Sequence, residues 1–323
     1  MKESKKIIKR LALISLCIIM TLSIVACGTN QNSSSDGTQK RYKIGLSMNT
    51  LNNPYFVDAK NGVEKGASEN NVRLSVVDAQ NDPSKQITDV ENLIAQKPDL
   101  IIIDPADSDS IVSAIEACNK NNIPVVTMDR RANGGTVVAH LGFDAVKSGN
   151  IAGEYIAKML DGKDANIVEI QGIMGTNVAQ DRSKGFNDVI SKHKNIKKVA
   201  TQSADFDRAK AMSVMENILQ ANKKIDAVYA SNDEMALGAL EAIKAAKREN
   251  EITLIGCDAI DDAISAVKNG SLDATIAEPP FFLGKNALLT AIKYLKGESV
   301  EKEVILESTL LTKDNVNTIK TKE

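Results

Sequence analysis

The feature that most constrains this chain is a regular alternation of short apolar runs with amphipathic helical segments, from residue 42 onward. Four strands, about 27 residues apart, are predicted to begin near Tyr42, Val72, Asp99 and Pro124. After a strand at 136–141 and a helix at 145–160, four more are predicted near Asn166, Lys197, Asp226 and Ile252. Two such runs over about 280 residues predict an α/β fold of two doubly wound parallel-sheet domains.

Polar side chains follow several of these apolar runs where the strands are predicted to end. Asp129 and Arg130 come directly after the run at 125–128. Asp104, Asn232 and Asp258 hold equivalent positions after other strands. Ligands bind at the carboxyl ends of parallel strands, and carboxylates accept the hydroxyl hydrogens of a polyhydroxyl ligand while a guanidinium donates. The pattern predicts one binding site; a surface ion pair is the alternative for Asp129 and Arg130 alone.

Aromatic side chains stand at two predicted strand-to-helix turns. Asn53 and Pro54 suit the cap and first position of a helix, so a helix start alone would explain them. Tyr55 and Phe56 follow directly, in a chain with 3% aromatic residues, and Phe206 lies at another such turn. Rings at these places predict stacking against a sugar. The methionines of 209–219 recur at helical spacing and predict core packing only.

The first 41 residues read as an export and anchoring segment. Residues 1–10 are basic and 11–25 are nearly all apolar, which predicts a signal peptide over 1–26. The run Ile24-Val25-Ala26-Cys27 resembles the lipobox of bacterial lipoproteins, which implies that Cys27 carries lipid. An ordinary signal with an incidental cysteine is the alternative. Residues 27–41 are polar and predict a flexible tether behind the lipid anchor.

Charge and composition exclude several functional classes. The signal segment carries five basic residues and one acidic residue, so its removal changes the formal net charge from −2 to −6. An acidic domain without basic runs argues against nucleic acid as a partner. Cys118 and Cys257 are predicted to be free thiols, and the two histidines lie in unrelated segments. No metal-ligand spacing and no cofactor fingerprint is present, so no metal or cofactor is expected.

Several stretches together carry a resemblance to a known family. They are residues 47–56, 78–83, 104–109, 129–130, 171–176, 182–186, 204–208 and 230–240. Through them the chain resembles bacterial ABC-transporter sugar-binding proteins of the D-ribose-binding type, over nearly all of 42–323. The resemblance implies a type I periplasmic binding protein fold, with two lobes joined by a three-segment hinge. The first lobe would comprise 42–143 plus 279–307, and the second 144–278 plus 308–323.

The resemblance also implies a set of ligand contacts. From the first lobe these are Asn53, Tyr55, Phe56, Asp104, Asp129 and Arg130, and from the second Arg182, Phe206, Asn232, Asp258 and Glu278. The ribose pattern has Asn, Phe and Gln where this chain has Asp104, Cys257 and Glu278. The substitutions replace amide donors by acceptors and a ring by a smaller group, which would suit a hexose, another pentose or a polyol.

The function implied is that of an extracytoplasmic solute-binding lipoprotein of an ABC importer, which captures a monosaccharide and delivers it to the permease and its ATPase. The expected protein is a monomer, anchored through Cys27 to the outer face of the cytoplasmic membrane. A sugar receptor for a sensor kinase or chemoreceptor is an alternative. A carbohydrate-active enzyme is another, because paired carboxylates can act as acid and base, but no nucleophile motif supports an enzyme.

Overall fold

The computed structural model describes residues 41–322. The predicted signal peptide and Cys27 lie outside these residues, as does all of the predicted tether except Arg41. Within the described part of the chain, none of the helices combines the length and the apolar character needed to cross a bilayer.

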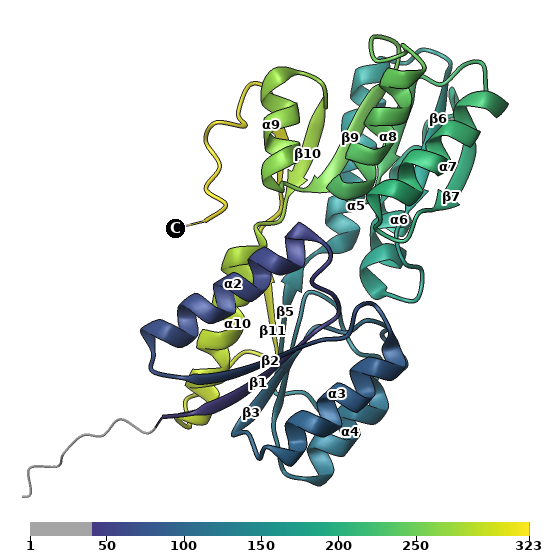
Figure 1. Cartoon of the computed structure of the whole chain (residues 1–323). Helices are drawn as coiled ribbons and strands as arrows, with labels where there is room; N and C mark the ends of the chain where they lie inside the picture. The colour runs from purple at the N-terminus through teal and green to yellow at the C-terminus, as the bar shows by residue number, and fades with distance from the viewer. Residues whose placement is uncertain (1–40, 323) are drawn as a thin grey trace, which may run out of the picture. The chain divides into compact units, whose positions relative to one another are not determined.

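The first lobe is built on a sheet of six strands, in the order β11-β5-β4-β3-β1-β2 within the described residues. Every neighbouring pair is parallel. The strands are β1 (Lys43–Met48), β2 (Arg73–Asp78), β3 (Leu100–Ile103), β4 (Val125–Met128), β5 (Ala139–Phe143) and β11 (Glu303–Leu306). Helices α2 (Pro54–Glu69) and α10 (Pro280–Leu295) pack together, as do α3 (Pro83–Ala95) and α4 (Val112–Lys120) (Figure 1).

The two faces of this sheet bury alternate residues of its strands. On β1, Ile44 and Leu46 belong to the core shared with α2 and α10. On β3, Ile101 and Ile103 belong to the core shared with α3 and α4. Because successive side chains of a strand point to opposite faces, a parallel sheet covered on both sides needs apolar residues at nearly every position. This requirement explains the unbroken apolar runs of the sequence.

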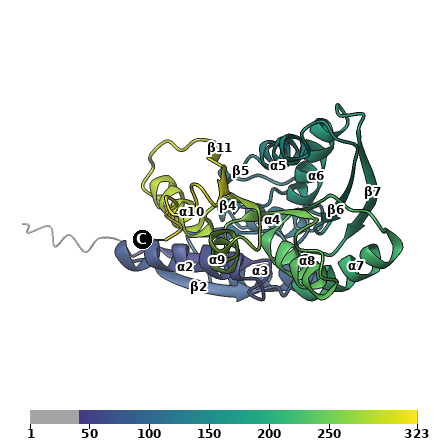
Figure 2. The ribbon, with the colours of Figure 1, turned by 90° about the horizontal axis from the view of Figure 1, so that it is seen from above.

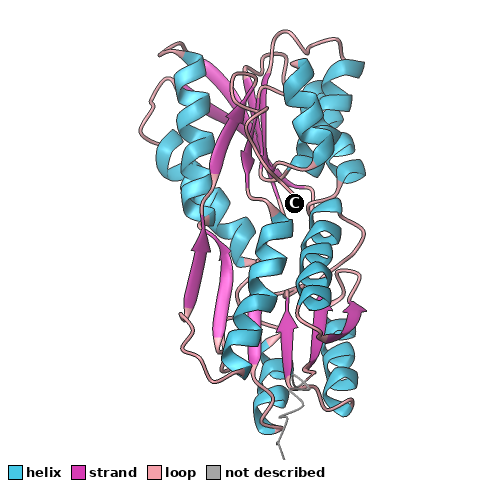
Figure 3. Ribbon diagram, turned by 90° about the vertical axis from the view of Figure 1, so that its left-hand side faces the viewer, coloured by secondary structure: helices cyan, strands magenta, loops and turns pink. Residues whose placement is uncertain are grey.

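The second lobe repeats the plan, with strands in the order β12-β10-β9-β8-β6-β7. Only β12 is antiparallel to its neighbour in this described sheet. The strands are β6 (Ala165–Gln171), β7 (Ile196–Ser203), β8 (Ala227–Ala230), β9 (Thr253–Asp258), β10 (Ala274–Ala277) and β12 (Thr309–Thr312). Helices α5 (Ala145–Leu160) and α6 (Asn177–Ile190) cover one face. The other is covered by α7 (Arg208–Ala221), α8 (Asp233–Ala245) and α9 (Asp261–Asn269) (Figure 2). In Figure 3, helices lie on both sides of the strands of this upper lobe.

The chain passes between the two sheets three times within the described residues. It leaves the first sheet after Phe143, returns between Ala277 and Pro280, and crosses again between Leu306 and Thr309. The predicted fold class is therefore confirmed: two doubly wound lobes are joined by three segments. In each sheet the first two strands are transposed, which creates a switch point where ligands bind at the carboxyl ends of the strands.

Eight of the nine predicted strand starts lie within one residue of those observed, and the predicted helix at 145–160 coincides with α5. The strand predicted at 136–141 is observed at Ala139–Phe143. The prediction that Met212 packs in the core is wrong, because its side chain is 37% exposed. The buried stripe of α7 contains Val214, Met215 and Ile218, and Met212 lies off this stripe.

Candidate functional site

A cavity lies where the carboxyl ends of both sheets meet. Its wall is formed by residues of the two lobes: Asn53, Tyr55, Phe56, Asp129, Arg130, Val178, Arg182, Phe206, Asn232 and Asp258. Nine of these were predicted from the sequence as ligand contacts, and their role as contacts stays a prediction. Two further predicted contacts, Asp104 and Glu278, are buried but do not line the cavity. Val178 was missed, because an aliphatic residue in the first turn of a helix carries no signal of its own.

The start of α2 supplies the aromatic part of the first-lobe wall. Asn53 caps the helix, since its side-chain oxygen accepts a hydrogen bond from the Tyr55 backbone nitrogen at 2.9 Å. Pro54 begins the helix, as predicted. The capped start places Tyr55 and Phe56 edge to face, with ring centroids 5.1 Å apart. Because the Asn53 oxygen is engaged as a cap, its amide nitrogen is the group that could donate to a ligand.

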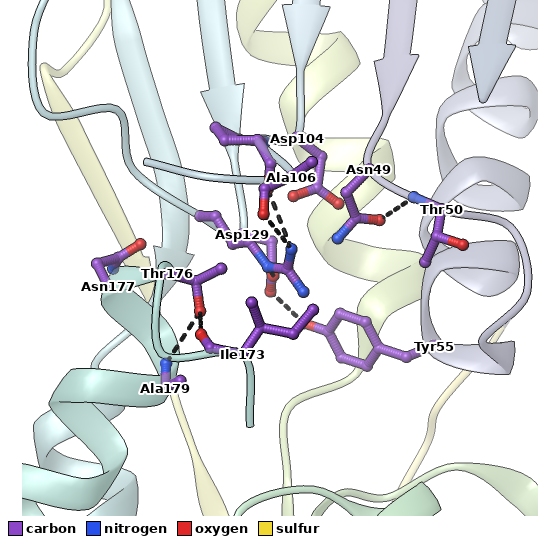
Figure 4. Close-up of polar contacts among 12 residues, drawn as sticks. Asn49, Thr50, Tyr55, Asp104, Ala106, Asp129, Ile173, Thr176, Asn177 and Ala179 are labelled. Atoms are coloured by element: carbon purple, nitrogen blue, oxygen red, sulfur yellow. Dashed lines mark hydrogen bonds and ion pairs between the residues drawn. The ribbon is translucent and has the colours of Figure 1, made fainter. Parts of the chain in front are cut away.

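Asp129 and Arg130 follow β4 in a tight turn. Asp129 has a φ of 57°, and the Arg130 backbone nitrogen donates to the Met128 carbonyl oxygen at 2.7 Å. The Tyr55 hydroxyl donates to Asp129 Oδ1 at 2.8 Å (Figure 4). Asp129 Oδ2 lies 3.9 Å from Arg130 Nε, which is too far for a hydrogen bond. One carboxylate oxygen is therefore engaged by the protein and the other is available to a ligand.

The Arg130 side chain joins the two lobes. Its Nη1 donates to the carbonyl oxygens of Pro105 and Ala106 at 3.1 and 3.3 Å. Its guanidinium carbon lies 5.2 Å from the ring centroid of Phe56 and 5.6 Å from that of Phe206. A guanidinium held between two rings gains a cation–π attraction from each of them. Arg130 is thus fixed by the first lobe and closes the cavity against the second.

Arg182 of α6 organises the second-lobe wall. Its Nη1 donates to the Ser231 carbonyl oxygen at 2.7 Å. Its Nη2 pairs with Asp258 Oδ1 at 3.2 Å and, more closely, with Glu278 Oε2. All three charged side chains are at least nine-tenths buried. The guanidinium therefore pairs with two carboxyl groups at once, one on the wall and one beneath it.

Glu278 connects the site to the hinge. Its Oε1 accepts hydrogen bonds from Ser148 Oγ and from Ser308 Oγ, the latter at 3.2 Å. Ser148 lies on α5 just after the first crossing, Ser308 lies in the third crossing, and Glu278 itself lies in the second. One buried carboxylate thus contacts all three crossing regions and Arg182. The family resemblance implied that Glu278 contacts the ligand, which stays a prediction; in the structure its carboxylate is bonded to these protein groups.

Several wall residues hold backbone conformations that side chains rarely adopt. Asp129 has a φ of 57°, Phe206 of 59° and Asp258 of 126°. Such residues cost about 1–3 kcal/mol each and gather at functional sites. Phe206 also depends on Gly172, since a Cβ there would overlap the Phe206 ring. Such conformations also occur elsewhere, for example at Lys97 and Lys247, but three of them belong to residues that face the cavity.

Burial dominates the electrostatics of the site. It raises the pKa of Asp129 and raises that of Asp258 well above its ordinary value, although Arg130 and Arg182 oppose the two shifts. The pKa of Asp104 is also raised well above its ordinary value, first by burial and then by the charge of Asp129. Neither carboxyl oxygen of Asp104 has a hydrogen-bond partner among the described residues. The first-lobe side of the site therefore holds an excess of acceptors.

Loops of the two lobes are hydrogen bonded to each other beside the cavity. The Arg131 backbone nitrogen donates to Asn177 Oδ1 at 2.8 Å. The Ser108 backbone nitrogen donates to the Gly175 carbonyl oxygen at 3.2 Å, and the Asn177 backbone nitrogen to Ser108 Oγ at 3.3 Å. These bonds close one side of the cleft. Sequence reasoning missed them, because their partners belong to separate lobes.

One group of described residues has the spacing of a metal site: atoms of Cys257, Asp258 and Glu278 lie within 4.8 Å of one another. Arg182 already pairs with both carboxylates, so its guanidinium supplies the positive charge that a metal would otherwise bring. The geometry favours the ion pairs over a metal centre. Cys118 and Cys257 are both free and buried, as predicted.

Comparisons with known proteins place this architecture in a family. Residues 44–299 match the periplasmic binding protein domain. The ribose import binding protein of Bacillus subtilis is 42% identical, with 90% of this chain and 96% of that protein covered. The ribose import binding protein of Escherichia coli is 43% identical, over 84% and 90%.

Solved structures agree with these relatives. An ABC transporter solute-binding protein from Bacillus halodurans with bound myo-inositol has a TM-score of 0.83 and 31% identity, over 87% of this chain and 98% of that one. These relatives are binding proteins of transport systems and not enzymes, in agreement with the prediction from sequence. The chain belongs to the periplasmic binding protein family.

Proposed function

We propose that this protein is the solute-binding component of an ABC importer and that it captures a monosaccharide between its two lobes. The observation that carries the proposal is a single cavity whose wall combines three aromatic rings with two carboxylates and two guanidinium groups. Relatives named as ribose import binding proteins support it, as do solved relatives with bound myo-inositol or D-allose.

The wall chemistry suits a sugar ring. The apolar faces of a sugar pack against flat rings such as Phe56 and Phe206, while its hydroxyls donate to Asp129 and Asp258 and accept from Arg182. Hydrogen bonds to charged partners contribute about 1.5–3 kcal/mol each. A few such bonds reach the roughly −8 kcal/mol of micromolar affinity. The proposed contacts are the nine predicted residues of the cavity wall.

Capture is proposed to proceed by closure of the lobes about the hinge. The lobes would comprise 42–143 with 279–307, and 144–278 with 308–323. A ligand shifts the equilibrium toward closure only to the extent that it prefers the closed form. Arg130 and Phe206 meet across the cleft in that form. The permease and its ATPase would then receive the closed, loaded protein.

Anchoring belongs to the same proposal. Cleavage after residue 26 would leave Cys27 as the first mature residue, carrying lipid, with 28–41 as the tether. The protein would work as a monomer on the outer face of the cytoplasmic membrane. Support comes from the lipobox-like sequence and from the extracytoplasmic role of the family.

A thermal-shift screen of the purified mature protein tests the function. The panel comprises D-ribose, D-xylose, D-allose, D-glucose, D-galactose, D-fructose, xylitol and myo-inositol. A ligand at about 100 times its Kd adds roughly 2.7 kcal/mol to the free energy of unfolding and raises the melting temperature. Absence of a shift with every compound at millimolar concentration, confirmed by calorimetry, would contradict the proposal.

Sensing without transport is a second candidate. A solved relative with a TM-score of 0.82 and 31% identity is the fructose-binding periplasmic domain of a hybrid two-component system. Uptake of the labelled best ligand by cells with and without the gene separates the two roles. Loss of uptake supports import. Unchanged uptake with a lost transcriptional response to the ligand supports sensing.

A further inference from the structure

We propose that the ligand of this site carries a protonated amino group, so that the protein takes an amino sugar or a related amino polyol. The inference rests on the proposed function, since it assumes that the cavity binds a monosaccharide-sized polyhydroxyl compound. It starts from a count of buried charges around the cavity and from one buried carboxyl group that has no partner.

Buried acidic groups outnumber buried basic ones at the site. Within residues 41–322, five buried carboxyl groups lie in the wall or next to residues that form it: Asp104, Asp129, Asp233, Asp258 and Glu278. Two buried guanidinium groups, of Arg130 and Arg182, face them. Buried charge is costly unless it is paired and hydrogen bonded. Burial raises the pKa of Asp104, Asp129 and Asp258 and so favours their neutral form, whereas a cationic ligand would favour their charged form.

Asp104 shows where the protein leaves this charge unmatched. Its side chain has no exposed surface, and neither carboxyl oxygen has a hydrogen-bond partner among the described residues. In Figure 4 its carboxyl group points toward the part of the site that contains Asp129 and Tyr55. Burial and the charge of Asp129 raise the pKa of Asp104 well above its ordinary value, and the charge and backbone of Arg130 oppose this only in part. The Arg130 Nη1 donates instead to the carbonyl oxygens of Pro105 and Ala106.

The pKa of the Tyr55 hydroxyl indicates that the electrostatic potential in this part of the site is negative. Tyr55 lines the cavity, and burial raises the pKa of its hydroxyl well above the ordinary value. The charges of Asp129, Glu278 and Asp258 raise this pKa further, and that of Arg182 opposes them. Three acidic groups from both lobes therefore act on a hydroxyl in the wall. The same negative potential would stabilise an ammonium group there.

The wall offers an ammonium group the acceptors that it needs. An ammonium has three donors and no acceptor. Among residues 41–322, Asp129 Oδ2 has no donor within hydrogen-bond distance, since Arg130 Nε lies 3.9 Å away. The Tyr55 oxygen, which donates to Asp129 Oδ1, can also accept. A neutral sugar hydroxyl could use one of these acceptors, but it brings no charge to offset the carboxylates.

Calorimetric titration of the purified full-length mature protein with matched pairs tests the inference. The pairs are D-glucose and D-glucosamine, D-galactose and D-galactosamine, D-ribose and 3-amino-3-deoxy-D-ribose, and sorbitol and glucamine. At about pH 6.5 the amines carry a proton. We expect the tightest ligand to be an amine that binds at least tenfold more tightly than its neutral partner. Tenfold corresponds to about 1.4 kcal/mol of binding free energy.

Asp104→Asn provides the matched variant. The substitution keeps the shape of the side chain, removes one negative charge and breaks no hydrogen bond of the described residues. The preference for the amine over its neutral partner should fall about tenfold. Glu241→Gln, which removes an exposed carboxylate paired with Lys244 on α8, is the control and should leave the preference unchanged.

The outcomes separate the inference from the proposed function. A neutral compound that binds more tightly than its amino partner overturns the inference and leaves the monosaccharide-binding function in place. An amine preference that Asp104→Asn leaves intact also overturns it, since the preference would then come from elsewhere. No binding by any compound of either kind overturns the proposed function itself.

Discussion

The substitution Asp129→Ala tests the first-lobe side of the site most directly. Asp129 Oδ1 is engaged by the Tyr55 hydroxyl at 2.8 Å, while Oδ2 is 3.9 Å from Arg130 Nε. Oδ2, together with the second lone pair of Oδ1, can therefore accept two ligand hydrogens. Each such bond to a charged acceptor contributes about 1.5–3 kcal/mol.

The expected loss of affinity follows from these contacts. Two lost bonds amount to about 3–6 kcal/mol, and each 1.4 kcal/mol is tenfold, so Kd should rise about a hundredfold to ten-thousandfold. The unliganded protein should change much less. It loses the Tyr55–Asp129 hydrogen bond, worth about 1 kcal/mol, but it also loses a buried carboxylate whose pKa burial has raised.

The assay is calorimetric titration with the best compound of the monosaccharide panel, beside thermal melting without ligand. Asp188→Ala is the control, because Asp188 belongs to an exposed ion pair with Lys184 on the outside of α6. Affinity within threefold of the unaltered protein, for a folded Asp129→Ala variant, would refute the reasoning. So would lower stability with intact affinity, which is the result expected of a purely structural loop pair.

Four further changes have distinct expected results. In urea unfolding, Asp104→Asn should stabilise the unliganded fold by about 1–2 kcal/mol at pH 8 and by less at pH 5. The pKa of Asp104 is raised in the folded protein, so the stability that the protonated side chain contributes is fully present below the unfolded pKa and is lost as pH rises through the folded pKa. Equal gains at both pH values would contradict this. Glu278→Gln should both lower the melting temperature and weaken ligand binding, because the Glu278 carboxylate contacts Arg182 and the hinge serines. A change in the melting temperature alone, or in the affinity alone, would contradict this link between the hinge and the site. Gly172→Ala should raise Kd at least tenfold and leave the circular dichroism spectrum unchanged, because the new Cβ displaces the Phe206 ring. An unchanged Kd would show that Phe206 does not contact the ligand. Cys27→Ala should move the protein from the membrane fraction to the medium or periplasm, and continued membrane association would exclude lipid on Cys27.

The sequence by itself determined the elements and their order. Apolar runs, caps and turn residues act locally, so the strand starts near 42, 72 and 99 could be located to within one residue. Polar residues at strand ends also pointed to Asp129 and Asp258, because the carboxyl ends of parallel strands meet at one edge. The family resemblance added Asn53 and Arg182 as wall residues, and Val178 was not predicted.

Only the tertiary structure decided what each carboxylate touches. Glu278 bonds to Ser148, 130 residues away in sequence, so no local pattern could place it at the hinge instead of in the cavity wall. Tyr55 and Asp129 are 74 residues apart, and their hydrogen bond engages one of the two oxygens that the sequence offered to a ligand. Asp104 differs from them because neither of its carboxyl oxygens has a hydrogen-bond partner in the described part of the chain, a fact that depends on how its surroundings are packed. The physical reason is that long-range contacts determine which side chains are buried and which groups they pair with. The periodicity of strands and helices depends only on residues that are close in sequence.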